Sequence, residues 1–386
     1  TFYNSSATGS GAFATTLAQI GGTDLFVVKY DTSGAVQWVA RAGSAGTDVA
    51  RGIAVDSGGN VYMTGYYTGT MTIYNSSAAG SGAFATTLAQ IGGTDVCTVK
   101  YNTSGAVQWV ARSGSAGTDF GFAIAVDSGS NVYVTGQYTG TMTFYNSSAA
   151  GSGAFATTLA QIGGIDVCTV KYNTSGAVQW VARSGSTLGT DIGNAIAVDS
   201  GGNVYVTGQY AGTPMTFYNS SAAGSGAFAT TLAQIGGIDV FIVKYNTSGA
   251  VQWVAQAGSA GTDIGNTIAV DSSGNLYVAG QYTGTMTFYN SSATGSGAFA
   301  TTLAQIGGAD VYTAKYDTSG AVQWVARSGS AGTDTRYGIT VDALGYVYMT
   351  GYYAGTMTIY NSGGTAFATT LAQLGGNDVY VAKYVA

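Results

Sequence analysis

Aspartate supplies every acidic side chain of this 386-residue sequence, because glutamate and histidine are both absent. The charged set is completed by six lysines and six arginines. General acid–base catalysis at this composition would depend on Asp, Lys or Tyr, and no base is recognisable beside a nucleophile. We therefore expect a protein that is not an enzyme, with no catalytic residue and no cofactor.

Three aspartates recur in each stretch of about 71 residues, for example Asp95, Asp119 and Asp127. Oxygen-rich loops suit Ca²⁺, so a calcium site is one interpretation. However, no D-x-D-x-D spacing occurs, and aspartate is also a common turn residue. We favour the structural interpretation and expect no metal site. The lysines, each five residues after an aspartate, are expected to be solvated or paired with turn carboxylates.

One tyrosine per repeat lies in a YYTG, QYTG or related phrase. Exposed rings beside Gln, Asn and Thr could stack on and hydrogen-bond sugars, giving one glycan contact per repeat. The alternative is that these rings pack between sheets. The positions are Tyr67, Tyr138, Tyr210, Tyr282 and Tyr353.

N-x-S/T acceptors for N-glycosylation occur in the phrases YNSS and YNTS. They matter only in a secreted, glycosylating context, and Asn-Ser is also ordinary turn chemistry. The YNSS positions are Asn4, Asn75, Asn146, Asn219 and Asn290; the YNTS positions are Asn102, Asn173 and Asn246.

Cys97 and Cys168 are 71 residues apart and so occupy the same position in successive repeats. Other repeats place Phe or Tyr there, as at Phe26 and Tyr312. A disulfide needs Cα atoms within about 7 Å, whereas equivalent points on stacked sheets are about 10 Å apart. Apolar packing, not a disulfide, is therefore the expectation.

The elements that hold these residues repeat along the whole chain. Five tryptophans stand in the same phrase, AVQWVA, at spacings of 71, 71, 73 and 71 residues. Insertions near Leu188 and at Pro214 account for the longer interval. We predict one repeat domain over 1–386, with copies at 1–71, 72–142, 143–215, 216–286 and 287–357 and a partial copy at 358–386.

Four segments of each copy read as strands. In the second copy DVCTVKY (95–101) alternates, NTSG makes a turn, AVQWVAR returns, and two further strands flank DSGSN. FATTLAQIGG, from Phe84, fits a helical turn or an extended segment equally well. Both faces of such a sheet are apolar, so each needs a neighbour. We predict an all-β fold, a β-propeller of about five four-stranded blades; an open or strand-exchanged ring is the alternative.

The phrases GIAVDSGGNVYMTGYYTGT, TDLFVVKYDTSG and AVQWVARAGSAGTD closely resemble the SBBP-type bacterial β-propeller repeat. The resemblance recurs in every copy and covers roughly two-thirds of each. It implies a propeller blade, often in secreted or surface-exposed bacterial proteins. The family carries no catalytic motif that could be transferred to this chain.

The net charge and hydropathy of the chain limit the classes of partner that it can bind. A net charge of −6 leaves no basic stripe for nucleic acid, and no run of 18 apolar residues could span a membrane. A surface rich in Ser, Thr, Asn and Tyr indicates an extracellular or cell-surface protein. The sequence begins inside a repeat without Met, so we expect either a processed leader or a segment of a longer protein.

The number of predicted strands does not divide evenly among the repeats, and one strand has no counterpart of the other types. Strands of the VKY type occur six times and each other type five times, so DVYVAKY (378–384) is surplus. Unpaired strand edges template pairing with another chain. We therefore expect self-association into a head-to-tail oligomer, as in a filament or surface-layer subunit. The alternative is a multivalent carbohydrate-binding or adhesive propeller that binds surface glycans.

Overall fold

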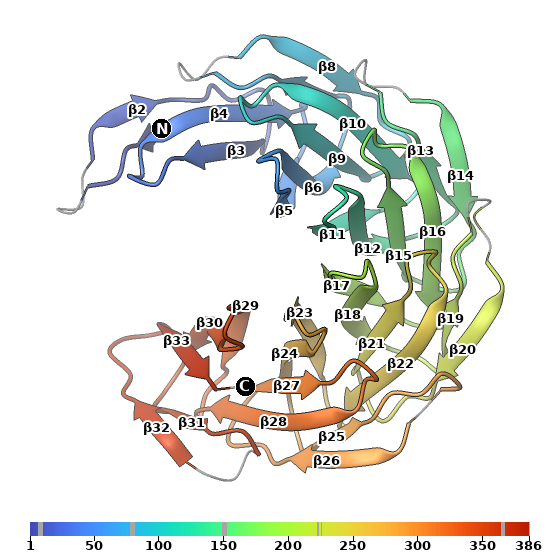
Figure 1. Cartoon of the computed structure of the whole chain (residues 1–386), viewed down its shortest axis with the longest axis vertical. Helices are drawn as coiled ribbons and strands as arrows, with labels where there is room; N and C mark the ends of the chain where they lie inside the picture. Colours follow the sequence, from blue (N-terminus) through green and yellow to red (C-terminus); the bar gives the residue numbers. More distant parts are fainter. Residues whose placement is uncertain are drawn as a thin grey trace. The chain divides into compact units, whose positions relative to one another are not determined.

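The computed structural model describes residues 1–6, 11–77, 82–148, 153–221, 224, 226–295, 297–363 and 367–385. All regular elements in this part of the chain are strands, β1 to β33 (Figure 1). The all-β prediction is therefore confirmed. The centre of the small-residue loop that follows Ser77 in the second copy lies outside the described residues.

The strands fall into six types, which we name A to F by their order across a sheet. The A-strands are β5 (Val49–Val55), β11 (Phe120–Val126), β17 (Ile192–Val198), β23 (Ile264–Val270) and β29 (Thr335–Val341). The B-strands are β6 (Val61–Tyr67), β12 (Val132–Tyr138), β18 (Val204–Tyr210), β24 (Leu276–Tyr282) and β30 (Val347–Tyr353). The C-strands, of the VKY type, are β3 (Leu25–Tyr30), β9 (Asp95–Tyr101), β15 (Asp166–Tyr172), β21 (Asp239–Tyr245), β27 (Asp310–Tyr316) and β33 (Asp378–Tyr384).

The remaining types carry the tryptophans and the connecting segment. The D-strands are β4 (Val36–Gly43), β10 (Val107–Gly114), β16 (Val178–Gly185), β22 (Val251–Gly258) and β28 (Val322–Gly329). The E-strands are β1 (Phe2–Tyr3), β7 (Met71–Tyr74), β13 (Met142–Tyr145), β19 (Met215–Tyr218), β25 (Met286–Tyr289) and β31 (Met357–Tyr360). The F-strands are β2 (Phe13–Thr15), β8 (Phe84–Leu88), β14 (Phe155–Leu159), β20 (Phe228–Leu232), β26 (Phe299–Leu303) and β32 (Phe367–Leu371).

Full sheets contain six strands in the order A-B-C-D-E-F, and all their pairings with a stated register are antiparallel. We expected four, and the difference is the connecting segment, which adds the E- and F-strands beside each D-strand. The full sheets are β5-β6-β9-β10-β13-β14, β11-β12-β15-β16-β19-β20, β17-β18-β21-β22-β25-β26 and β23-β24-β27-β28-β31-β32. Shorter sheets are β3-β4-β7-β8, β29-β30-β33 and β1-β2.

The chain interlaces successive sheets. After β10 it forms β11 and β12 in the following sheet, then returns to add β13 and β14 beside β10. Only two residue pairs, Ser113↔Phe144 and Gly114↔Thr143, join β10 to β13. The E- and F-strands therefore pair along the outer edge of one sheet after the chain has already formed two strands of the next sheet.

Contacts divide the chain into two compact units, where the sequence suggested one domain. The first consists mainly of Thr1–Gln161 and Val170–Val181, and the second mainly of Ala182–Ser221 and Ser225–Ala386. Each unit is described by itself below.

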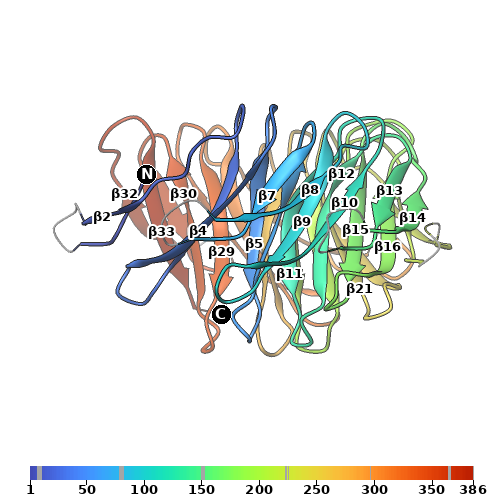
Figure 2. The same cartoon turned by 90° about the horizontal axis from the view of Figure 1, so that it is seen from above.

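Sheets within a unit stack through their A-, B- and C-strands. In the first unit β11 packs against β5, β6 and β9, and β5 and β11 lie side by side in both views (Figures 1 and 2). In the second unit β29 packs in the same way against β23, β24 and β27. Where a sheet has a neighbour on each face, side chains of both faces are buried, as in β9.

The tryptophans occupy equivalent places, as predicted. Trp38 in β4 pairs with Lys29, and Trp109 in β10 pairs with Lys100. The indole of Trp38 donates a 3.0 Å hydrogen bond to the carbonyl of Thr103, in the C–D turn of the next repeat. Trp109 makes the same bond to the carbonyl of Thr174 at 3.1 Å, so these two indoles tie their sheets to the turn of the neighbouring repeat. The indole nitrogens of Trp253 and Trp324, in contrast, are buried without a hydrogen-bond partner in the described structure.

The turn between C- and D-strands follows the expected chemistry. The side-chain carbonyl of Asn102 accepts hydrogen bonds from the backbone N–H groups of Ser104 (3.0 Å) and Ala106 (2.9 Å). Gly105 has φ of 77°, a conformation that glycine adopts without steric cost. Cys97 and Cys168 are buried and form no disulfide, as expected.

Candidate interaction surfaces

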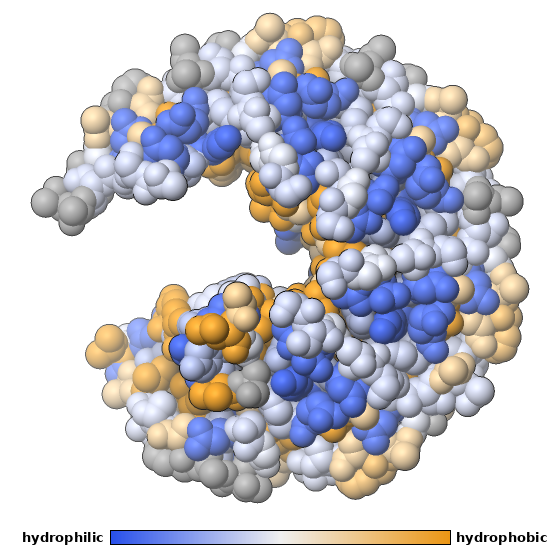
Figure 3. Space-filling view, viewed as in Figure 1, coloured by the Kyte–Doolittle hydropathy of each residue, from blue (hydrophilic) through white to orange (hydrophobic). Residues whose placement is uncertain are grey.

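One face of β33, in the second unit, is uncovered. Val379 is 78% exposed and Val381 is 71% exposed, whereas the equivalent residues of β27, Val311 and Thr313, are buried. The difference arises because β29 covers β27, while no described strand covers β33 on this face. Hydrophobic residues gather over β29, β30 and β33 in the space-filling view (Figure 3).

The same face contains a hollow of about 440 Å³. Isolated exposed valines are common on protein surfaces, but a hollowed apolar patch indicates an interaction site. The hollow is lined by Gly338, Ile339, Thr340, Tyr348, Met349, Thr350 and Val381.

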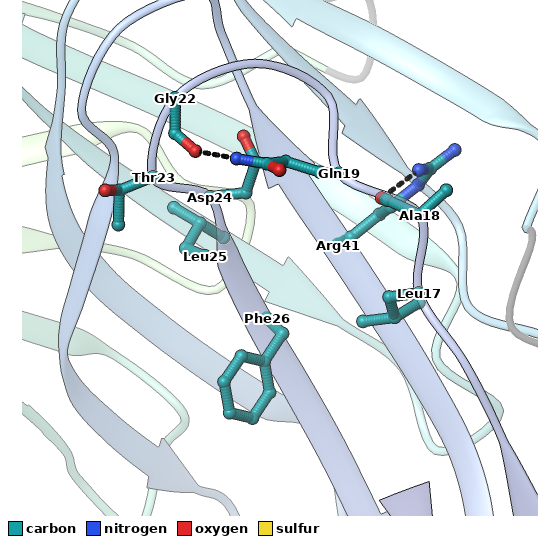
Figure 4. A pocket seen from close by; sticks show the side chains of 9 residues that line it. All are labelled: Leu17, Ala18, Gln19, Gly22, Thr23, Asp24, Leu25, Phe26 and Arg41. Atoms are coloured by element: carbon teal, nitrogen blue, oxygen red, sulfur yellow. Dashed lines mark hydrogen bonds between the residues drawn. The ribbon is translucent and has the colours of Figure 1, made fainter. Parts of the chain in front are cut away.

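In the first unit the other face of a C-strand is uncovered, on β3. Phe26 and Tyr30 of β3 are 54% and 46% exposed, whereas their equivalents in β9, Cys97 and Tyr101, are buried. A hollow of about 400 Å³ lies beside Phe26 (Figure 4). It is lined by Leu17, Ala18, Gln19, Gly22, Thr23, Asp24, Leu25, Phe26 and Arg41.

Two backbone-anchored side chains shape this hollow. The side-chain amide of Gln19 donates to the carbonyl of Gly22, and the guanidinium of Arg41 donates to the carbonyl of Ala18 (Figure 4). Arg41 also lies over the ring of Tyr74, 4.5 Å from its centroid. The side chains of Gln19 and Arg41 are therefore held by bonds to the backbone. Phe26 is the exposed large apolar side chain at this site.

The two uncovered faces are the two halves of the contact that recurs inside each unit. In the second unit Val311 of β27 packs in one cluster with Tyr380 and Tyr384 of β33. In the first unit Leu25 of β3 packs in the same way with Cys97 of β9. Val379 and Val381 are equivalent to the residues on the Val311 side of this contact, and Phe26 and Tyr30 are equivalent to those on the Tyr380 side. The two uncovered faces therefore carry the two sets of residues that pack together inside each unit.

The aspartates at the start of the A-strands form buried corners with serine. In the first unit Asp119 accepts hydrogen bonds from the Ser115 backbone N–H (2.6 Å) and the Thr139 N–H (3.0 Å). Its Oδ2 also lies 2.8 Å from Ser115 Oγ. Burial raises the pKa of Asp119 to about 6, against these hydrogen bonds.

The Ser115 hydroxyl has a single proton but faces two acceptors. Besides Asp119 it contacts the carbonyl of Thr139, and it accepts from the Gly117 N–H at 3.0 Å. The hydroxyl donates toward both oxygens. Burial is the main cause of the raised pKa of Asp119, and it outweighs the bond from Ser115 to Asp119 Oδ2, which lowers the pKa of the carboxyl.

The other recurring aspartates are also structural in this geometry. Asp95 Oδ2 accepts the Ile91 N–H at 2.5 Å, and burial raises the pKa of Asp95. Asp127 accepts the Asn131 N–H at 2.8 Å in the A–B turn. Burial acts against it, but hydrogen bonds from Asn131 lower the pKa of Asp127. The described residues contain no group of three or more His, Cys, Asp or Glu side chains that could hold a metal ion.

The five tyrosines proposed as glycan contacts are buried. The Tyr67 hydroxyl donates to the carbonyl of Ala89 at 2.9 Å, and the Tyr353 hydroxyl donates to that of Ala372 at 2.8 Å. A ring buried in the core presents no face to a sugar, so the glycan-contact interpretation is corrected to packing. The set is Tyr67, Tyr138, Tyr210, Tyr282 and Tyr353.

The YNSS asparagines are half-buried and fasten the connecting segment to the D-strand. The side-chain carbonyl of Asn75 accepts the Val107 N–H at 2.8 Å. Asn4, Asn146, Asn219 and Asn290 make the same bond to Val36, Val178, Val251 and Val322. These contacts give the asparagines a structural role and leave glycosylation a prediction.

Comparison with known proteins supports the repeat fold. A family model described as "Beta-propeller repeat", SBBP, matches residues 37–69, 108–137, 179–209 and 252–281. Four stretches along the chain therefore match the SBBP β-propeller repeat. Each SBBP match spans a D-strand and the A- and B-strands that follow it.

An uncharacterized WD repeat-containing protein of Acanthamoeba polyphaga mimivirus is 28% identical over 401 residues. The alignment covers 94% of this chain and 28% of that protein, so the chain spans little more than a quarter of the relative's length. Among the residues with a described structure, no helix has the length and hydropathy needed to cross a bilayer.

The sequence did not reveal the uncovered faces. Phe26 and Val381 stand in strands of the same pattern as their buried equivalents. The surplus C-strand was the available signal, since it showed that one sheet has no D-strand of its own. A second signal was Arg336, which stands where three other repeats have glycine.

Proposed function

We propose that this chain is a non-enzymatic, extracellular structural protein whose copies assemble head to tail. The contact joins the Val379–Val381 face of β33 on one copy to the Phe26–Tyr30 face of β3 on another. The observation that supports it is the exposure of both halves of a contact that is otherwise buried at each sheet stack. A head-to-tail contact produces open fibres when its rotation does not close.

The energetics are adequate for a specific contact. Full burial of one Val or Phe side chain contributes about 1.5–3 kcal/mol, and three such residues, together with Tyr30, are uncovered here. None of the four is charged, and the whole chain has only 8% charged residues. Lys383 is the exposed cation on the same face of β33, and its ammonium must stay hydrated or paired when the contact forms. The low charge and the eight N-x-S/T acceptors are what support an extracellular location.

Sedimentation velocity and electron microscopy of the purified 386-residue chain test the assembly. We expect particles whose mass grows with concentration. Val381→Asp and Phe26→Asp should each give monomers, because a buried unpaired carboxylate is strongly unfavourable. Leu188→Asp, at an exposed loop residue away from both faces, is the matched control and should assemble normally.

Mixing the two variants separates this contact from other causes of association. Val381→Asp retains a working β3 face and Phe26→Asp retains a working β33 face, so an equimolar mixture should form dimers and nothing longer. A wild-type chain that stays monomeric at every concentration would refute the proposal. Antibody labelling of intact source cells tests the extracellular location separately.

A further inference from the structure

Arg336, in the A-strand β29, is a buried guanidinium in a position where three other repeats have glycine and the first has Ala50. It is 1% exposed, and its equivalents are Gly121, Gly193 and Gly265. At Gly265 an added Cβ would lie 2.3 Å from Thr207 Oγ1 of the preceding sheet. Most repeats therefore have no space for a side chain here.

Space for Arg336 is provided by a second change. The residue equivalent to Thr207 is alanine in β24, at Ala279. Ala279 is fully buried and belongs to the cluster that contains Tyr380. The glycine–threonine pair of other repeats is therefore replaced by an arginine–alanine pair at this one contact, which lies wholly within the second unit.

The Arg336 guanidinium lacks a partner within the described chain. None of its three nitrogen atoms makes a hydrogen bond, although all are buried. No carboxylate is among the groups that act on it; those groups are the phenols of Tyr312 and Tyr380. Burial lowers the pKa of Arg336 to about 10, so the side chain is still charged at neutral pH.

The two phenols near Arg336 also lack partners. The hydroxyls of Tyr312 and Tyr380 are buried and make no hydrogen bond. Burial is the main cause that raises the pKa of each, and Arg336 acts in the opposite direction. Both phenols therefore remain protonated and can donate. The equivalent side chains Cys168 and Phe241 have no such hydroxyl.

The strand register places two of these groups in one row. Arg336 pairs with Gly351, and Gly351 pairs with Tyr380, across β29, β30 and β33. In the preceding sheet an added Cβ at Gly280 would lie 1.8 Å from the Tyr312 ring. At Gly351 the three nearest atoms are instead backbone atoms of Thr335 and Arg336. An added Cβ there would lie 2.0 Å from the Thr335 carbonyl oxygen, so only glycine fits between Arg336 and Tyr380 in this row.

We propose that Arg336 and Tyr380 bind a small monovalent anion of the chloride class. Together they offer a guanidinium and a phenol donor but no acceptor with a negative charge, and a buried charge requires a compensating partner. A single guanidinium matches a single negative charge. Water could accept some of these hydrogen bonds but would leave the charge uncompensated.

Thermal unfolding of the full chain in sodium chloride and in sodium gluconate, at matched ionic strength, tests the site. Chloride should raise the Tm along a saturating curve, by roughly 2–4 °C at saturation, and gluconate should not. Arg336→Gly, which restores the residue of other repeats, should abolish the difference between the two salts. Arg327→Gln removes a charge from the D-strand β28 and should retain it.

Two further measurements identify the ligand and its contacts. Tyr380→Phe should shift the chloride midpoint to higher concentration without changing the gluconate curve. Crystals soaked in bromide should show an anomalous peak beside Arg336. Equal curves in the two salts, with no bromide peak, would mean that water fills the site and would overturn the proposal; so would an Arg336→Gly variant that keeps the chloride effect.

Discussion

Acidification from pH 8 to pH 5 should stabilise this protein, because buried aspartates carry raised pKa values. Burial raises the pKa of Asp119, Asp191 and Asp263 to about 6, from 3.8 in the unfolded chain. A raised pKa means that the folded state binds the proton more tightly. Its contribution to stability is complete below pH 3.8 and is lost as the pH rises through 6.

The magnitude follows from proton linkage. One such carboxyl costs the folded state about 3 kcal/mol at pH 8 and about 1.6 kcal/mol at pH 5. The gain is about 1.4 kcal/mol per carboxyl, or about 4 kcal/mol for the three. Histidine, the usual group that titrates in this range, is absent. Turn aspartates such as Asp56, whose pKa is about 2, reverse the trend below about pH 4.

Urea denaturation at pH 5, 6.5 and 8, at constant ionic strength, measures the effect. Asp119→Asn should lose stability at every pH, because an amide N–H would face the Ser115 or Thr139 N–H. Its free energy of unfolding should nevertheless change by about 1.4 kcal/mol less between pH 8 and pH 5. Asp127→Asn, at a carboxyl with a lowered pKa, should keep the wild-type pH dependence.

The reasoning fails if wild-type stability is constant or falls on acidification to pH 5. It also fails if Asp119→Asn retains the full pH dependence, since the corner would then not be the titrating group. Either result would mean that the Asp119–Ser115 corner holds an ionised carboxylate.

Two substitutions test the packing. Gly114→Ala should destabilise by about 1–3 kcal/mol, because the new Cβ would lie 2.0 Å from Asp95 Oδ1; Gly58→Ala, with its nearest atom at 3.3 Å, should be tolerated in the same denaturation assay. Trp38→Phe should cost about 1–3 kcal/mol, because it removes ring volume and the hydrogen bond to Thr103. A Trp38→Phe variant as stable as wild type would show that this indole does not tie the sheet to the next turn.

The strands and their repeat could be predicted because their signals are local. Alternation in DVCTVKY, glycine in the turns and the spacing of the tryptophans all act within a few residues. FATTL could not be assigned, because its partner is the E-strand about ten residues earlier, beyond a small-residue loop. The strand β8 turns Thr86 and Leu88 inward and leaves Phe84 exposed, which reverses the usual preference for Phe.

The site could not be predicted because both faces of these sheets are buried. Period-2 alternation distinguishes a core face from a solvent face only when one face meets water. Tyr67 stands beside polar residues in the sequence but is buried, whereas Phe26 resembles a core residue and is exposed. Exposure here depends on which sheet has a neighbour, and that is a property of the array rather than of any one repeat.

The interlacing of strands has a consequence for how such a gene can lengthen. Because the E- and F-strands of one copy complete the sheet before it, the unit that is duplicated does not need to coincide with a sheet. A tandem duplication of about 71 codons, with its breakpoints anywhere in the repeat, adds one whole sheet. Every D-strand keeps its E- and F-strand partners. The insertions near Leu188 and at Pro214 lie between strands, where they leave this register undisturbed. Unequal crossing-over between near-identical copies would therefore add or remove whole sheets. No intermediate gene would encode a protein with an incomplete extra sheet.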